Sequence, residues 1–281
     1  MMRRSLTALA AALAVGGIWS QTAAAIAPPV GECPDVVFIG AAGSGEGGKS
    51  QNNGMGNSVK YIADRLEQKL AADGETMRRL AVIYTAAPVE TLTQLSTADI
   101  SALAAHFPTG VARYYVKHLR PYLASIQDGI SQTITETRLM AQNCPDADIV
   151  LAGYSQGAMA VHQAELQMDA ANDEALDNVA GTILLADGDR VPHSAAKRFG
   201  NAPLGGEGIR PWAKFVAIKD VFDPESTVQI CDAWDPVCDF NKSRIRHLDK
   251  RKHDYFNNGR RVLLDQAVDW FSIEIMGLGP A

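Results

Sequence analysis

The sequence lacks an apolar run long enough to cross a bilayer as a helix, which takes about 20 consecutive apolar residues. The run at residues 6–19 is shorter, follows Arg3 and Arg4, and precedes small residues at 22–25. This order is typical of a cleaved secretion signal. We therefore expect residues 1–25 to be a signal peptide, with a retained N-terminal anchor as the alternative. Residues 26–281 then have a length common for a single α/β domain, in a protein secreted to the extracellular space or the cell envelope.

The chain also lacks an excess of basic residues, with 26 Lys and Arg against 32 Asp and Glu and a net charge of −6. An acidic protein is repelled by nucleic-acid phosphates and by anionic lipid headgroups. We therefore expect no nucleic-acid partner. The basic cluster at residues 247–253 is the local exception, and a solvated turn accounts for it.

Cysteine is scarce, since only Cys33, Cys144, Cys231 and Cys238 are present. An even number of cysteines in an exported protein indicates disulfides. Three pairings are open. The short loop between Cys231 and Cys238 is the easiest to close, which leaves Cys33 for Cys144. The paired spacing of a zinc ribbon is absent, so disulfides are favoured over a zinc site.

Short apolar runs alternate with stretches of helical spacing along the chain. The runs have the composition of buried parallel strands and lie at residues 36–39, 80–84, 149–152, 181–186 and 215–218. The helical stretches lie at residues 59–70, about 116–140, after Ser155, and 262–275. This alternation predicts an α/β fold, with a mostly parallel five-stranded sheet covered by helices on both faces. Residues 88–108 and 192–212 lack such patterns and are expected to be long loops, which either border a cleft or only connect elements.

The stretch Gly153-Tyr154-Ser155-Gln156-Gly157 matches the Gly-x-Ser-x-Gly pattern of a nucleophile elbow. Residues 148–152 before it resemble a strand and residues 158–166 after it resemble a helix, which is the order that an elbow needs. An ordinary glycine-bounded turn is the alternative. In an elbow, Ser155 is the nucleophile, and the Gln156 amide opens the helix and faces a developing oxyanion.

A serine hydroxyl needs a base to take its proton and an acid to orient that base. In hydrolases with this elbow the chain order is serine, acid, histidine. Asp232, Asp235 and Asp239 are the acid candidates after Ser155. Both His247 and His253 follow them, so either histidine can be the base.

Residues 43–50 also fit the phosphate-binding pattern G-x-x-x-x-G-K-S. A phosphate-binding loop continues into a helix, whereas the Asn- and Gly-rich residues 51–56 are poor helix formers. Export from the cell and the cysteine arrangement also argue against a nucleotide-binding protein. We interpret the glycines as a turn whose amides face an oxyanion.

Several motifs together resemble the cutinase family of secreted α/β-hydrolases over most of the mature chain. They are Cys33-Pro34-Asp35, Gly43-Ser44-Gly45-Glu46, Cys144-Pro145-Asp146, the elbow around Ser155, and the loop from Cys231 to Cys238. The resemblance implies the α/β-hydrolase fold and the disulfides Cys33–Cys144 and Cys231–Cys238.

The same resemblance assigns the catalytic roles. It implies Asp235 as the acid, His253 as the base, and an oxyanion hole made by the amides of Ser44 and Gln156, with the Ser44 hydroxyl as a third donor. It also implies a monomer that needs no metal or organic cofactor and whose partner is an ester or lipid substrate, with contact to a lipid or polymer surface.

The chain departs from the family at Ala42, where the family usually has Arg. Residues 187–190 look more like the actinobacterial branch, some of whose members act on lipids and thioesters. We therefore expect a secreted serine esterase of lipids or polyesters, with a phospholipase, thioesterase or acyltransferase of envelope lipids as the alternative. A hydrolase fold without activity is a further alternative.

Overall fold

A computed structural model of the chain describes residues 33–47, 52–88, 120–213, 217–240, 250–257 and 259–279. The chain divides into residues 1–31 and 32–281, and all described residues belong to the second unit. Several expectations therefore lie outside the described residues: the signal peptide at 1–25, the lysine and serine of the phosphate-loop pattern at 49–50, most of the segment 88–108, and His247.

Six strands form one fully parallel sheet in the order β2-β1-β3-β4-β6-β5. In chain order they are β1 (Val36–Ala41), β2 (Met77–Ala81), β3 (Asp148–Tyr154), β4 (Val179–Leu185), β5 (Lys197–Phe199) and β6 (Thr227–Ile230). The central strands β1, β3 and β4 arise from the apolar runs that the sequence shows. They are buried on both faces, as parallel strands between helices are.

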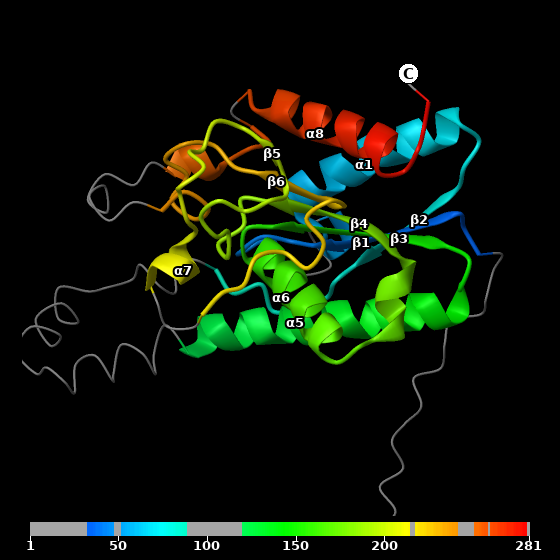
Figure 1. The fold of residues 1–281 in the computed structure, drawn as a ribbon, viewed down its shortest axis with the longest axis horizontal. Helices are drawn as coiled ribbons and strands as arrows, with labels where there is room; N and C mark the ends of the chain where they lie inside the picture. Colours follow the sequence, from blue (N-terminus) through cyan, green and yellow to red (C-terminus); the bar gives the residue numbers. More distant parts are fainter. Residues whose placement is uncertain are drawn as a thin grey trace, which may run out of the picture. The chain divides into compact units, whose positions relative to one another are not determined.

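Helices cover both faces of this sheet (Figure 1). The helices are α1 (Gly56–Ala72), α5 (Arg120–Asn143), α6 (Gln156–Ala170), α7 (Ile209–Ala213) and α8 (Arg261–Glu274), with 3-10 turns η1 (Asn52–Gly54), η3 (Glu174–Asn178) and η5 (Lys250–His253). The α1 and α8 helices pack on one face, against Phe38 and Val150 among others. The α5 and α6 helices pack on the other, where Ile39 and Leu151 point. Alternate residues of each central strand therefore enter two separate cores.

The α1 helix shows why these segments are helical. Its buried positions include Val59, Ile62, Leu66 and Leu70, which recur every three or four residues on one face. The helix ends at Ala72, and Gly74 shortly after it has a φ of +86°, the left-handed conformation that a glycine adopts without strain. Among the described residues, no helix is long and apolar enough to cross a membrane.

The sheet differs from the prediction in four respects. It has six strands rather than five, because β5 is a three-residue edge strand inside the expected loop 192–212. The expected strand at 215–218 is wrong where it is described, since residues 217–218 are irregular and β6 follows later. The β6 strand was missed because two of its four residues, Thr227 and Gln229, are polar although buried. The second strand lies at Met77–Ala81 rather than 80–84, and its edge position leaves its two arginines half-buried.

Both disulfides implied by the resemblance are confirmed, as Cys33–Cys144 and Cys231–Cys238. The first joins the entry of β1 to the residue after α5. The second closes the loop that follows β6. The first therefore fixes the segments that lead into β1 and β3, and the second fixes the loop that carries Asp235.

Candidate active site

Ser155 lies in the turn between β3 and α6, in the strand-turn-helix order that the sequence predicts. Its backbone is at φ 55° and ψ −114°, a conformation that costs a non-glycine residue about 1–3 kcal/mol. The two flanking glycines permit this sharp turn. A Cβ on Gly157 would lie 2.2 Å from the Ala41 carbonyl oxygen, and one on Gly153 would lie 2.5 Å from the Gly157 carbonyl oxygen. The glycines are therefore required by backbone contacts around the serine.

Three of the predicted residues lie in hydrogen-bonding contact. His253 Nε2 is 2.9 Å from Ser155 Oγ, and His253 Nδ1 is 3.0 Å from both carboxylate oxygens of Asp235. Ser155 and Asp235 are 4% and 0% exposed. This arrangement can transfer a proton from a serine hydroxyl to an imidazole that a carboxylate orients.

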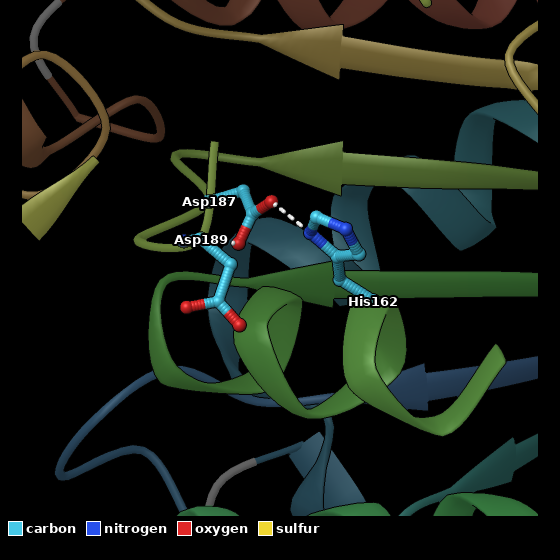
Figure 2. A group of neighbouring side chains, drawn as sticks. All are labelled: His162, Asp187 and Asp189. Atoms are coloured by element: carbon cyan, nitrogen blue, oxygen red, sulfur yellow. Dashed lines mark hydrogen bonds and ion pairs between the residues drawn. The ribbon is translucent and has the colours of Figure 1, made fainter. Parts of the chain in front are cut away.

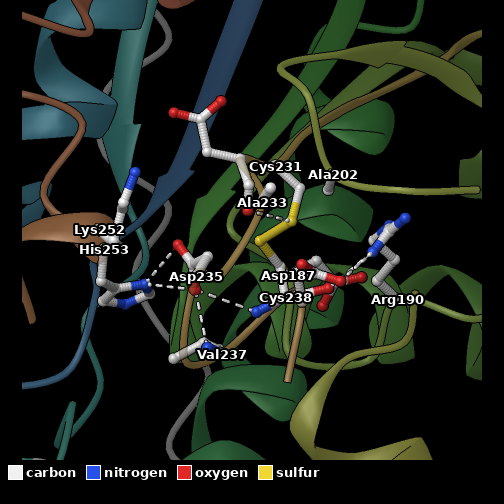
Figure 3. Close-up of a disulfide and its surroundings, with 12 residues drawn as sticks. Asp187, Arg190, Ala202, Cys231, Ala233, Asp235, Val237, Cys238, Lys252 and His253 are labelled. Atoms are coloured by element: carbon white, nitrogen blue, oxygen red, sulfur yellow. Dashed lines mark hydrogen bonds and ion pairs between the residues drawn. A yellow bond between two sulfur atoms is a disulfide. The ribbon is translucent and has the colours of Figure 1, made fainter. Parts of the chain in front are cut away.

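The Asp235 carboxylate is held inside the Cys231–Cys238 loop (Figure 3). Oδ1 accepts hydrogen bonds from the backbone N–H groups of Val237 and Cys238, at 2.7 and 3.1 Å. Oδ2 accepts one from the Tyr255 hydroxyl at 3.0 Å. These donors stabilise a buried negative charge and fix its direction toward the histidine.

The other two acid candidates make different contacts. Asp232 forms an ion pair with Arg260 Nε at 3.2 Å. Asp239 accepts a hydrogen bond from the Trp234 amide at 2.8 Å. Within the described part of the chain, only Asp235 among the three meets the ring of His253.

Tyr154, the residue before the serine, supports His253. The two rings stack with centroids 5.1 Å apart and planes 27° apart. The Tyr154 hydroxyl donates to the backbone carbonyl of His253. Burial raises the pKa of Tyr154 well above its usual value of 10, so the phenol remains a neutral donor. Tyr154 therefore holds the His253 imidazole that faces Ser155, the next residue of the elbow.

The glycine-rich turn after β1 lies beside the elbow. The Gly43 N–H donates to the Glu46 carboxylate at 3.3 Å, and the Gly45 N–H donates to a carbonyl after β2 at 2.8 Å. Ser44 lies between them, and its own N–H meets no acceptor in the described part of the chain. The Gln156 N–H is the first of α6 and has no partner within that helix. Both predicted oxyanion donors are therefore available to a ligand.

A buried charged cluster that the sequence did not predict joins α6 to the segment after β4 (Figure 2). His162 Nδ1 on α6 is 2.8 Å from the Asp187 carboxylate, which follows β4. Asp189 accepts hydrogen bonds from Gln163 at 2.9 Å and Arg210 at 2.8 Å. The fold brings these groups together from α6, the segment after β4 and α7, so their contact could not be predicted from the sequence. The only sequence feature that pointed to the cluster was the charged stretch Asp187-Gly188-Asp189-Arg190.

The protonation of His162 decides what this cluster can bind. Its ligand atoms lie close enough together to hold a metal ion. Burial alone would lower the pKa of His162, but the Asp187 charge and hydrogen bond, with Asp189 and Glu165, raise it to about 9. A proton and a metal ion compete for the imidazole, and in the metal-free chain the cluster is a buried ion-pair network.

Arg190 connects this cluster to the Cys231–Cys238 loop, which carries Asp235 and is called the acid loop below. It is 2% exposed, donates to the Cys238 carbonyl at 2.9 Å and to the Pro203 carbonyl, and lies 3.9 Å from the Asp239 carboxylate. The guanidinium therefore fixes the end of the loop that carries Asp235, and no sequence pattern indicates that this arginine is buried.

The family model for cutinase matches residues 32–271. The chain belongs to the cutinase family. A curated cutinase from Hypocrea jecorina (strain QM6a) is 35% identical over 74 residues, which cover 24% of this chain and 29% of that protein. Cutinase cut1 from Trichoderma harzianum is 34% identical over the same shares. The chain thus matches less than a third of the length of these curated relatives.

Solved structures of low identity share the fold of this cutinase-family chain. A cutinase-like protein from Cryptococcus sp. has a TM-score of 0.59 at 17% identity, covering 89% of this chain and 98% of that one. The catalytic core of acetyl xylan esterase from Trichoderma reesei has a TM-score of 0.57 at 18% identity, covering 86% and 100%. The chain has the α/β-hydrolase fold.

Proposed function

We propose that this cutinase-family chain is a secreted serine esterase that hydrolyses carboxylic ester bonds of lipids or polyesters. The observation that carries the proposal is the contact of His253 Nε2 with Ser155 Oγ at 2.9 Å, with Asp235 on the other ring nitrogen. Such a chain of groups activates a serine hydroxyl for acyl transfer.

In the proposed reaction, His253 takes the proton from Ser155 Oγ as that oxygen attacks the ester carbonyl carbon. The carbonyl oxygen becomes an oxyanion, which accepts hydrogen bonds from the amides of Ser44 and Gln156. The intermediate collapses, the alcohol leaves with the proton held on His253, and an acyl group stays on Ser155. His253 then takes a proton from water, the hydroxide attacks the acyl carbon, and the carboxylic acid leaves as Ser155 regains its proton. Apart from the ester and the water molecule, every group that takes part in these steps is a side chain or backbone amide of this chain.

Two further features support secretion of the protein and its contact with a lipid or polymer surface. The disulfides fit an oxidising compartment outside the cytoplasm, as does the expected signal peptide at residues 1–25. Trp234, next to the acid, is 43% exposed, and Leu204 is 59% exposed. Exposed apolar side chains of this kind suit contact with a lipid or polymer surface, and the proposed enzyme acts as a monomer.

The test is hydrolysis of p-nitrophenyl esters of increasing acyl-chain length, run beside a phospholipid and an acyl thioester. The wild-type chain is expected to cleave esters, and Ser155→Ala is expected to lose about 10⁶-fold in kcat. The chain-length optimum identifies the acyl group. Cleavage of the phospholipid or thioester alone would replace the esterase proposal with the alternative.

The choice of base has its own test, because His247 lies outside the described residues. His253→Ala is expected to abolish hydrolysis, whereas His247→Ala is expected to retain it. An inactive His247→Ala with an active His253→Ala would reverse the assignment.

A further inference from the structure

A chain of buried hydrogen bonds leads from the segment after β2, through α5, to the glycine-rich turn. It begins at the Ala87 backbone N–H, which donates to Ser125 Oγ at 2.9 Å. Ser125 Oγ in turn donates to Gln156 Oε1 at 3.1 Å. A backbone N–H can only donate, so the Ser125 hydroxyl accepts from Ala87 and donates its own proton to Gln156 Oε1. This fixes the Gln156 amide with its oxygen toward Ser125 and its Nε2 group on the other side.

The Tyr122 phenol, in the first turn of α5, is buried and interacts with Ser44 and with the Gln156 side chain. Burial raises the pKa of the Tyr122 phenol, while Ser44 and the Gln156 side chain act to lower it. A neighbour that lowers the pKa of a phenol presents a proton to its oxygen. Gln156 Nε2 is buried and has no hydrogen-bond partner among the described residues. A donation from this amide to the phenol oxygen satisfies the buried Nε2 group.

Either oxygen of the Tyr122–Ser44 pair can be the donor, and a donation from Gln156 to the phenol leaves the phenol proton for Ser44. Tyr122 is 8% exposed and stays neutral at neutral pH, and a buried neutral phenol places its proton on an acceptor. Ser44 Oγ lies 3.1 Å from the Tyr122 oxygen. Once Ser44 accepts this proton, its own hydroxyl proton has to point elsewhere. The turn lies against the elbow, since a Cβ on the adjacent Gly43 would be 2.5 Å from the Tyr154 ring.

We propose that Tyr122 is a positioning residue, which, backed by Gln156 and Ser125, turns the Ser44 hydroxyl proton toward the oxyanion at Ser155. This inference rests on the proposed function and adds to it a directed path from a backbone N–H to the reacting centre. Gln156 then serves the oxyanion twice, through its own amide N–H and through the orientation of Ser44.

The test compares Tyr122→Phe, Ser44→Ala and the double variant on one p-nitrophenyl ester. Ser44→Ala is expected to lower kcat about 100-fold, as the loss of an oxyanion donor does, and Tyr122→Phe about 10-fold, with KM within about twofold of wild type in both. The double variant is expected to match Ser44→Ala, because Tyr122 acts only through Ser44. The matched control is Tyr61→Phe, which removes a phenol bonded to Asp265 at 2.9 Å between α1 and α8, and which is expected to keep the wild-type kcat.

A second variant tests the direction of the chain without removing Tyr122. Gln156→Glu keeps the size of the side chain but presents only acceptors when ionised, so the Tyr122 proton turns to the carboxylate and Ser44 donates to Tyr122 instead. We expect kcat at pH 8 to fall about 10-fold or more. This variant carries the test if Tyr122→Phe does not fold.

Two results would overturn the inference: a wild-type kcat in Tyr122→Phe or in Gln156→Glu, or losses that multiply in the double variant. Its failure is distinguishable from failure of the proposed function. An active wild type whose Ser155 reacts with a fluorophosphonate, together with either result, removes only the role of Tyr122. An inactive, unlabelled wild type removes both.

Discussion

Tyr154 and His253 make two contacts at once, a ring stack with centroids 5.1 Å apart and a hydrogen bond from the Tyr154 hydroxyl to the His253 carbonyl. The two residues are 99 positions apart in the chain. His253 ends a single 3-10 turn, which offers little support of its own. The position of the imidazole over Ser155 therefore depends on Tyr154.

This relationship predicts graded effects at Tyr154. Tyr154→Ala removes the stack and the hydrogen bond, and we expect kcat for a p-nitrophenyl ester to fall about 100-fold because the imidazole loses its position. Tyr154→Phe keeps the stack and is expected to lose about 10-fold or less. Equal losses in the two variants would show that the stack contributes nothing.

Asp235→Asn is expected to lower kcat about 10⁴-fold, as the equivalent change does in a serine protease, because an amide selects the wrong imidazole tautomer. The control is Asp232→Asn, which alters the neighbouring ion pair with Arg260 and leaves His253 untouched. Steady-state kinetics on one ester measures both. Similar losses in the two variants would contradict the assignment of the acid.

Arg190→Met is expected to destabilise the fold by about 3 kcal/mol, since the carbonyls of Cys238 and Pro203 lose a buried charged donor. Arg138→Met is the matched control, because it removes a 50% exposed arginine paired with Asp173 and is expected to cost about 0.5 kcal/mol. Urea unfolding measures both. Equal free energies of unfolding in the two variants would contradict the anchoring role of Arg190.

Stability is expected to fall as the pH rises from about 6.5 to 9. In the folded chain the pKa of His162 is raised from 6.5 to about 9, so its stabilising charge is complete below 6.5 and is lost as the pH passes 9. Burial raises the pKa of Glu165 from 4.5 to about 7, which adds a loss between these values in the same direction. Thermal unfolding of the wild type at pH 6 and 9.5 measures the decline, and His162→Gln should flatten its upper part. A wild-type Tm that rises over this interval would contradict the charge state of His162.

The sequence predicts the centre of the fold better than its edges. Strands β1, β3 and β4 are continuous apolar runs because helices cover them on both faces. Strand β6 was not predicted, because Thr227 and Gln229 are buried polar residues that interrupt an apolar run. The edge strands β2 and β5 are partly exposed and carry arginine and lysine, so neither gives an apolar signal.

At the candidate site, features encoded in local motifs could likewise be predicted better than features that depend on long-range contacts. The elbow is a local motif that predicts Ser155 directly, whereas the residues alone left Asp232, Asp235 and Asp239 open and only the resemblance of the acid loop to the cutinase family selected Asp235. The residues that support this site, Tyr122, Tyr154, Arg190 and Tyr255, act through contacts with residues 20 to 99 positions away. Arg190 lies next to a segment rich in glycine, proline and polar residues, a composition that indicates a surface loop, and yet it is buried.

The central claim is that Ser155 is the nucleophile of an esterase, and its most direct test is covalent labelling. The purified wild-type chain is treated with a fluorophosphonate, and the adduct is mapped by mass spectrometry, with Ser155→Ala as the control. We predict one adduct, on Ser155, together with loss of ester hydrolysis, and no adduct in Ser155→Ala. Labelling at another residue, or an unlabelled chain that still hydrolyses esters, would contradict the account.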